Sequence, residues 1–157
     1  MQLGATRKAY SILTKSKGLM NIKILFSLHT TSKVSYIFIS ILGGPGSCKG
    51  RIVHDILSVF RFKLISAEEL IIKSLPRKLA NVISLDDMND IMQIIRTDPK
   101  HITLNWVFSL IIREIESLLT HHDCFLVDVI PNMRFLLRHP EFVKDCLQEM
   151  EEFEKQV

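Results

Sequence analysis

An apolar run that leads directly into a cluster of glycines narrows the possible folds more than any other stretch of this chain. Residues 34–42 (VSYIFISIL) are rich in isoleucine, tyrosine and phenylalanine and are bounded by glycine. Such runs are typical of a strand buried on both faces of a parallel sheet. Residues 43–50 follow as a glycine-rich turn, and residues 51–61 carry apolar side chains at helical spacing. The order strand, glycine-rich loop, helix predicts an α/β fold with a parallel sheet.

The composition is that of one folded globular domain. The chain has 157 residues, of which 47% are hydrophobic and 24% are charged. No segment approaches the roughly 18 to 20 uninterrupted apolar residues of a membrane span, so none is expected. The three cysteines, an odd and low number, argue against a disulfide framework and favour a reducing compartment, for which the cytoplasm is the first expectation.

Charge is distributed unevenly along the chain. Residues 1–54 hold eight basic and no acidic residues, whereas residues 55–157 hold twelve basic and seventeen acidic ones. We expect residues 1–33 to be a basic leader, poorly ordered or partly a strand over residues 21–28 (NIKILFSL). Three functions remain open for it: an organelle transit segment, which would make the location mitochondrial, a basic arm for an anion, or a solvated leader.

Predicted helices and strands alternate in the rest of the chain. A strand over residues 62–65 leads into Ser66 and Glu69, which form a capping box, a pattern that satisfies free amides at a helix start. Pro76 is expected to end that helix near residue 75. Further helices are predicted over residues 84–97, 103–119 and 140–155, and a further strand over residues 124–127. In the last helix the stripe expected to be buried comprises Val143, Cys146, Leu147, Met150 and Phe153.

The glycine-rich turn has the chemistry of a phosphate-binding loop. Residues 43–50 (GGPGSCKG) come close to the pattern G-x-x-x-x-G-K-[ST], in which backbone amides and a lysine hold phosphate oxygens. Cys48 stands where glycine is expected, and a side chain there costs roughly 1–2 kcal/mol if the backbone needs a positive φ. Gly50 stands where a hydroxyl for magnesium is usual. The alternative is a strand-to-helix turn that binds nothing.

This loop resembles the GGPGSGKGT loop of adenylate kinases and related nucleoside monophosphate kinases. Residues 62–70 (FKLISAEEL) are similar to the family's segment Y-G-F-x-x-[IL]-S-x-G-D-L-L-R. Residues 125–132 (FLVDVIPN) are similar to F-[IL]-[IL]-D-G-[FY]-P-R. The resemblance covers residues 36–157. It implies a three-layer P-loop nucleoside-kinase-like fold over residues 34–157, with a helical monophosphate-binding insert near residues 66–100.

The same resemblance implies a reaction and the residues for it. The ancestral reaction is transfer of the terminal phosphoryl group of ATP to a nucleoside monophosphate. Lys49 and Asp128 would be catalytic, with Asp128 holding Mg²⁺ through water, and Ser66 and Arg134 would line the monophosphate site. The residues that would bind ATP are Gly44, Pro45, Gly46, Ser47, Cys48, Lys49, Gly50 and Arg51.

The chain also departs from the family. The family's arginine of the second block falls on Ile72, the arginine of the third block falls on Asn132, and a monophosphate-selecting glutamine falls near Leu136. The sequence also ends before the family's arginine-bearing lid, so the fold would be incomplete at its C-terminus. We therefore expect an ATP-binding domain that is weak or inactive alone. The alternatives are a non-catalytic interaction or regulatory module and a fragment of a larger nucleotide kinase.

The expected partners follow from these features. Nucleotides are the ligands, and no pattern of basic and aromatic residues suggests a nucleic-acid surface. A sheet of only three strands would leave the strand over residues 34–42 at an edge, where so apolar a strand invites aggregation or docking. We expect residues 21–28 to cover this edge, or else a protein partner or self-association.

Overall fold

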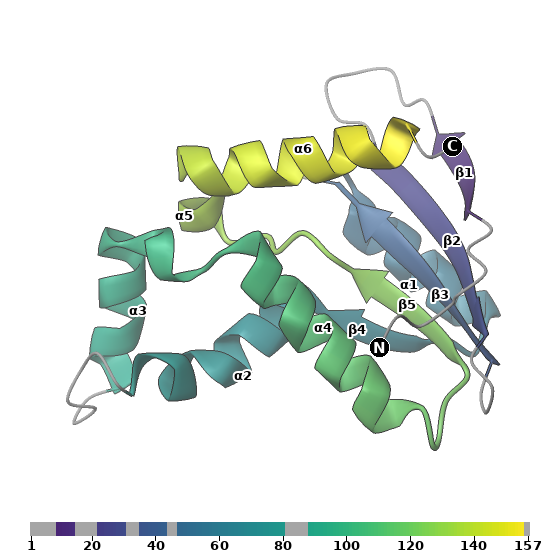
Figure 1. Cartoon of the computed structure of the whole chain (residues 1–157), viewed down its shortest axis with the longest axis horizontal. Helices are drawn as coiled ribbons and strands as arrows, with labels where there is room; N and C mark the ends of the chain where they lie inside the picture. The colour runs from purple at the N-terminus through teal and green to yellow at the C-terminus, as the bar shows by residue number, and fades with distance from the viewer. Residues whose placement is uncertain (1–8, 15–21, 31–34, 44–46, 81–87, 156–157) are drawn as a thin grey trace.

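The chain forms an α/β structure with a five-stranded sheet in the order β1-β2-β3-β5-β4 (Figure 1). The computed structural model describes residues 9–14, 22–30, 35–43, 47–80 and 88–155. Strands β3, β5 and β4 are parallel, as the sequence predicts, and β1 and β2 continue the sheet in antiparallel fashion. The strands are β1 (Ala9–Thr14), β2 (Ile22–Thr30), β3 (Ser35–Leu42), β4 (Lys63–Ser66) and β5 (Cys124–Asp128).

Strand β2 covers the free edge of β3. The register runs from Lys23 opposite Leu42 to Thr30 opposite Ser35. The prediction that residues 21–28 cover this edge is therefore confirmed for the described part of that segment. The alternative, a partner chain at the same place, is not needed for that edge, because β2 already pairs with it.

Strand β1 corrects the prediction of an irregular leader. Residues Ala9–Thr14 pair with β2, from Ala9 opposite Ser27 to Thr14 opposite Ile22. Residues 9–14 (AYSILT) show no clear alternation of apolar and polar side chains, and pairing with a neighbouring strand decides strand formation more than intrinsic propensity does. The first strands of the chain thus form an antiparallel meander that belongs to the sheet.

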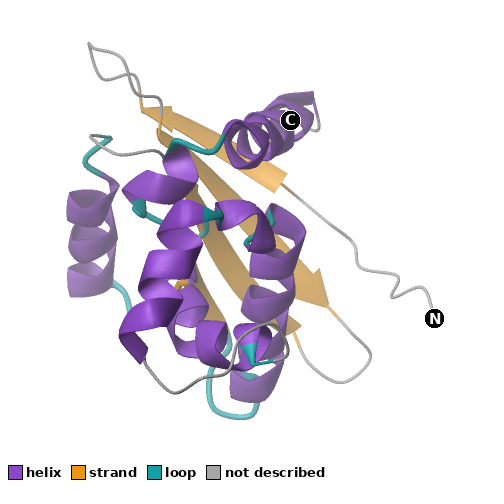
Figure 2. Cartoon of the chain, turned by 90° about the vertical axis from the view of Figure 1, so that its left-hand side faces the viewer, coloured by secondary structure: helices purple, strands orange, loops and turns teal. Residues whose placement is uncertain are grey.

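Helices cover both faces of the sheet and produce three layers. In Figure 1, α4 and α6 lie in front of the strands and α1 lies behind them, and Figure 2 shows helices on both sides of the strands. The helices are α1 (Lys49–Val59), α2 (Ala67–Leu79), α3 (Met88–Thr97), α4 (Leu104–Leu118), α5 (Arg134–Leu137) and α6 (Pro140–Lys155), with a 3-10 turn at Pro99–His101. None of the helices in the described ranges is long and apolar enough to cross a bilayer.

Strand β5 divides the core between the two faces. Leu126 packs with Ile41 and Val53 on the α1 side. Phe125 and Val127 belong to the larger cluster formed with the helices of the opposite side. The three central residues of β5 are all buried, because side chains alternate across a strand that has a helix layer on each face. This double burial explains the continuous apolar run in the sequence.

Helix α2 continues through Pro76, so the prediction that it ends near residue 75 is wrong. It extends to Leu79, and the amide of Ala80 donates to the carbonyl of Pro76 at 3.0 Å. An internal proline costs about 3 kcal/mol, whereas full burial of one leucine contributes about 1.5–3 kcal/mol. Leu75 and Leu79 are both buried, so packing of the apolar face offsets the missing hydrogen bond.

The other predicted helix limits agree more closely. Helix α3 ends at Thr97, directly before Asp98-Pro99, while its predicted start at Ser84 lies outside the described residues. Helix α4 is capped by Thr103, whose hydroxyl accepts a hydrogen bond from the amide of Trp106 at 3.3 Å. Helix α5 is absent from the sequence-based prediction, because its four residues are too few to show a period.

Candidate functional site

Three elements of the fold meet at the carboxyl edge of the parallel strands. Strand β3 ends at Leu42, and after the turn α1 begins at Lys49. Strand β5 ends at Asp128, which lies opposite Ile41 on one side and Ser66 on the other. Ligands of open α/β sheets bind beyond the carboxyl ends of the strands, so this edge is where a site is expected.

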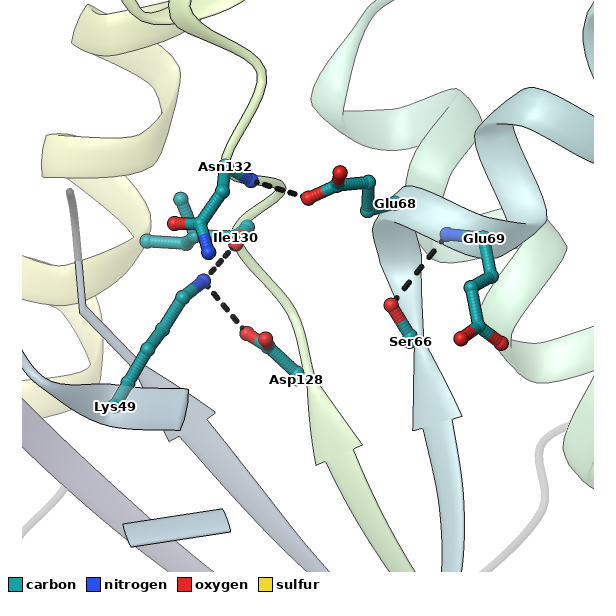
Figure 3. A network of polar contacts seen from close by, with 7 residues as sticks. All are labelled: Lys49, Ser66, Glu68, Glu69, Asp128, Ile130 and Asn132. Atoms are coloured by element: carbon teal, nitrogen blue, oxygen red, sulfur yellow. Dashed lines mark hydrogen bonds and ion pairs between the residues drawn. The ribbon is translucent and has the colours of Figure 1, made fainter. Parts of the chain in front are cut away.

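Lys49 and Asp128 form a partly buried ion pair at this edge. The Nζ of Lys49 donates to Asp128 Oδ1 at 2.7 Å and also to the backbone carbonyl of Ile130 (Figure 3). The side chain of Lys49 is 3% exposed and that of Asp128 is 21% exposed. Among the described residues, Lys49 is the one charged residue classed as buried. The two residues that the family resemblance makes catalytic are thus in contact, although 79 positions separate them.

The surroundings of Asp128 act on it in opposite directions. Burial raises the pKa of its carboxyl group above 3.8, the hydrogen bond and charge of Lys49 oppose that rise, and the charge of Glu68 adds to it. Burial is the largest of these effects. Lys49 therefore favours the anionic form of Asp128, against the effect of burial.

Ser66 begins α2 at the same edge. Its Oγ accepts a hydrogen bond from the amide of Glu69 at 3.4 Å, so the predicted N-cap is present. The hydroxyl predicted to line a monophosphate site therefore has a structural role as well. Arg134, the other residue predicted for that site, is exposed at the beginning of α5. No hydrogen bond or ion pair between described residues joins Arg134 to Lys49 or Asp128.

The end of the glycine-rich turn is described, and its middle, residues 44–46 (Gly44, Pro45 and Gly46), lies outside the described residues. Ser47 is buried, while Cys48, Gly50 and Arg51 are exposed. Cys48 has φ 59° and ψ 19°, a left-handed conformation, and precedes the first turn of α1. The position that the family fills with glycine therefore does require a positive φ, and the cysteine is strained there.

Replacing Cys48 with glycine is expected to raise the free energy of unfolding by about 0.5–1 kcal/mol. Glycine removes the cost of roughly 1–2 kcal/mol that a side chain pays in the left-handed conformation of the folded state. The greater backbone entropy of glycine stabilises the unfolded chain by about 0.4–1 kcal/mol and offsets part of this gain. Urea denaturation followed by circular dichroism measures the difference. Cys48→Ala is the matched control, because it removes the thiol and keeps the Cβ at φ 59°. Equal stabilisation by the two substitutions would contradict backbone strain as the cause.

Sequence reasoning missed a second acidic side chain that makes a contact at this edge. Oε2 of Glu68 accepts a hydrogen bond from the backbone amide of Asn132 at 3.0 Å (Figure 3). The capping pattern drew attention to Glu69, and no local signal links Glu68 to a residue 64 positions away. The only sequence feature that could have pointed to this hydrogen bond is the presence of two adjacent acidic residues after the N-cap.

Among the described residues, the carboxylate of Asp128 is the one acidic group in contact with Lys49, and it could also bind a magnesium ion. Within the described ranges, no group of three or more histidine, cysteine, aspartate or glutamate side chains could hold a metal ion. Mg²⁺ usually takes only one or two carboxylates and completes its shell with phosphates and waters. Lys49 contacts Oδ1 of Asp128, and an ionised carboxylate keeps acceptor capacity on its second oxygen. The residues present therefore fit the ion, with Asp128 as the candidate ligand.

Comparison with family models, with curated proteins and with solved structures found no match to this chain.

Proposed function

We propose that this chain is an adenylate-kinase-like P-loop domain that binds ATP with Mg²⁺ and transfers phosphoryl groups weakly or not at all by itself. The observation that carries the proposal is the contact of Lys49 with Asp128 at 2.7 Å. The lysine begins the helix after a glycine-rich turn, and the aspartate ends the neighbouring parallel strand. A phosphate-binding lysine and a magnesium-binding aspartate are expected to lie close together, since both act on the same phosphate groups.

Each side chain has a definite task under this proposal. The amides of the turn and the first turn of α1 would hold phosphate oxygens, with Lys49 as a cation at their centre. Asp128 would orient a hydrated Mg²⁺, which supplies charge neutralisation when bound. Arg51, exposed in the first turn of α1, is a second cation within the same helix turn.

The residues that would grip a second nucleotide are missing, which supports weak turnover. Ile72 is 51% exposed where the family has an arginine, and Leu136 is fully buried where it has a glutamine. Asn132 is exposed and carries no charge. Phosphoryl transfer depends on positioning and charge neutralisation, so these substitutions lower the rate more than the affinity for ATP. They favour, as the second candidate, a nucleotide-responsive interaction or regulatory module.

Equilibrium titration with ATP and ADP, with and without Mg²⁺, tests the proposal. We expect the wild-type chain to bind and Lys49→Met to bind about tenfold to hundredfold more weakly, since a hydrogen bond to a charged group contributes about 1.5–3 kcal/mol. Lys73→Met is the matched control, because Lys73 is exposed on α2. Circular dichroism confirms that each variant is folded at the temperature used.

A folded wild-type chain that binds neither nucleotide at millimolar concentration would rule the proposal out. Where binding occurs, a coupled assay of phosphoryl transfer separates a weak kinase from a module that only binds.

A further inference from the structure

Glu68 ties the beginning of α2 to the loop after β5. It is the second residue of α2, and its Oε2 accepts the amide hydrogen of Asn132 at 3.0 Å. Figure 3 shows its carboxylate directed across the gap between the ends of β4 and β5. The contact is at the surface, where a dissolved ligand can compete for the same amide.

Two carboxylates, those of Asp128 and Glu68, lie at this edge beside a single buried lysine. Lys49 is the one cation in direct contact with Asp128 among the described residues, and it is bonded to that carboxylate. Glu68 lies near enough to raise the pKa of Asp128 by its charge. The charge of Lys49 is therefore already paired with Asp128, and Glu68 adds a second carboxylate nearby.

This arrangement has a direct consequence for anionic ligands. Backbone amides beyond the carboxyl ends of parallel strands are natural positions for phosphate groups. The Asn132 amide already holds an anion, the carboxylate of Glu68. A phosphate that approached it would have to displace Glu68 and would then lie close to two negative charges.

We propose that Glu68 is a specificity-determining residue whose carboxylate occupies the Asn132 amide as an internal anion and excludes a nucleoside monophosphate from the edge between β5 and α2. This inference rests on the proposed function, in which ATP binds at Lys49 and a second nucleotide would be the phosphoryl acceptor. Under this inference, weak binding of the acceptor nucleotide has two causes: the carboxylate of Glu68 and the absence of the family's arginines.

Two substitutions at Glu68 test the inference. Glu68→Gln removes the charge and keeps an oxygen that can accept from Asn132, whereas Glu68→Ala also vacates the amide. Glu69→Gln is the matched control, because it removes the same charge one residue along, and the Ser66 cap uses only the backbone amide of Glu69. AMP, GMP, CMP, UMP and inorganic phosphate are each titrated by calorimetry in the absence of ATP.

Both Glu68 variants are expected to bind at least one monophosphate about tenfold more tightly than wild type and Glu69→Gln, because a like charge in contact with the phosphate has been removed. Glu68→Ala is expected to gain at least as much as Glu68→Gln. The inference would be overturned if neither folded variant bound any monophosphate more tightly than wild type. Tighter binding of inorganic phosphate alone would overturn the assignment to nucleotides.

The experiment separates the inference from the proposed function. ATP titration of the same proteins reports on the site at Lys49, and monophosphate titration reports on Glu68. If wild type binds ATP but the Glu68 variants do not bind monophosphates more tightly, the proposed function is supported and the inference about Glu68 is not. Tighter monophosphate binding by the Glu68 variants, in proteins that do not bind ATP, would support the role of Glu68 and rule out the ATP site at Lys49. If Glu68→Ala does not fold, Glu68→Gln, which has the same shape as glutamate, decides.

Discussion

Lys49→Met is expected to lower the free energy of unfolding by about 3 kcal/mol, because removal of one partner from a buried ion pair leaves the other charge without compensation. The substitution deprives Asp128 of its cation and the carbonyl of Ile130 of a donor. Asp128 retains some contact with water, which places the effect at the lower end of the range for such pairs. Urea denaturation of wild type, Lys49→Met and the exposed-site control Lys73→Met measures it.

A double-mutant cycle with Asp128→Asn identifies the source of the loss. The double variant Lys49→Met with Asp128→Asn is expected to lose about 2 kcal/mol less than the sum of the single losses, since it buries no unpaired charge. Additive losses, or a Lys49→Met midpoint equal to that of Lys73→Met, would contradict a stabilising ion pair. Because the cycle uses no nucleotide, its result is independent of the proposed function.

Ile24→Pro is expected to lower the free energy of unfolding by about 3 kcal/mol or more, since proline removes an amide donor and does not fit an internal strand. Ile24 lies between two paired strands, opposite Ile12 of β1 and Ile41 of β3. Its amide therefore faces a neighbour on whichever side it points. Ile24→Val is the control, because it retains a β-branched residue and an amide hydrogen.

Thermal and urea unfolding compare the two variants at Ile24. A midpoint of Ile24→Pro equal to that of Ile24→Val would contradict the sheet of five strands. It would then restore the interpretation of residues 1–33 as a leader that is separate from the folded domain. The expected loss, in contrast, would show that the segment contributes to the stability of the folded domain.

Much of the fold could be predicted because its signals are local. The apolar run, glycine-rich turn and helix follow one another directly, and the caps at Ser66 and Thr103 each involve a residue three positions along. The contact between Lys49 and Asp128 could be anticipated from the resemblance to the kinase family, which supplied the long-range information that local patterns lack.

The remainder depends on packing that a single sequence does not display. Helix α2 passes Pro76 because buried leucines on its apolar face offset the break. Of the stripe predicted for α6, Cys146 is buried as expected, whereas Leu147 is 55% exposed, and the buried Phe142 was not part of the prediction. The side chains of Met150 and Phe153 lie outside the described residues. The bond between Glu68 and Asn132 is equally non-local, so helical periodicity carries no trace of it.

The position of β5 between β3 and β4 sets an order of events during synthesis. The antiparallel meander of β1, β2 and β3 is complete once Leu42 has been translated. The second edge of β3 then waits for β5, which begins only at Cys124. At about 5–20 residues per second, this edge stays open for roughly ten seconds on the ribosome. Throughout that interval an apolar strand presents unpaired amides and carbonyls, so the nascent chain is most exposed to chaperones and to misassembly before its last strand is made.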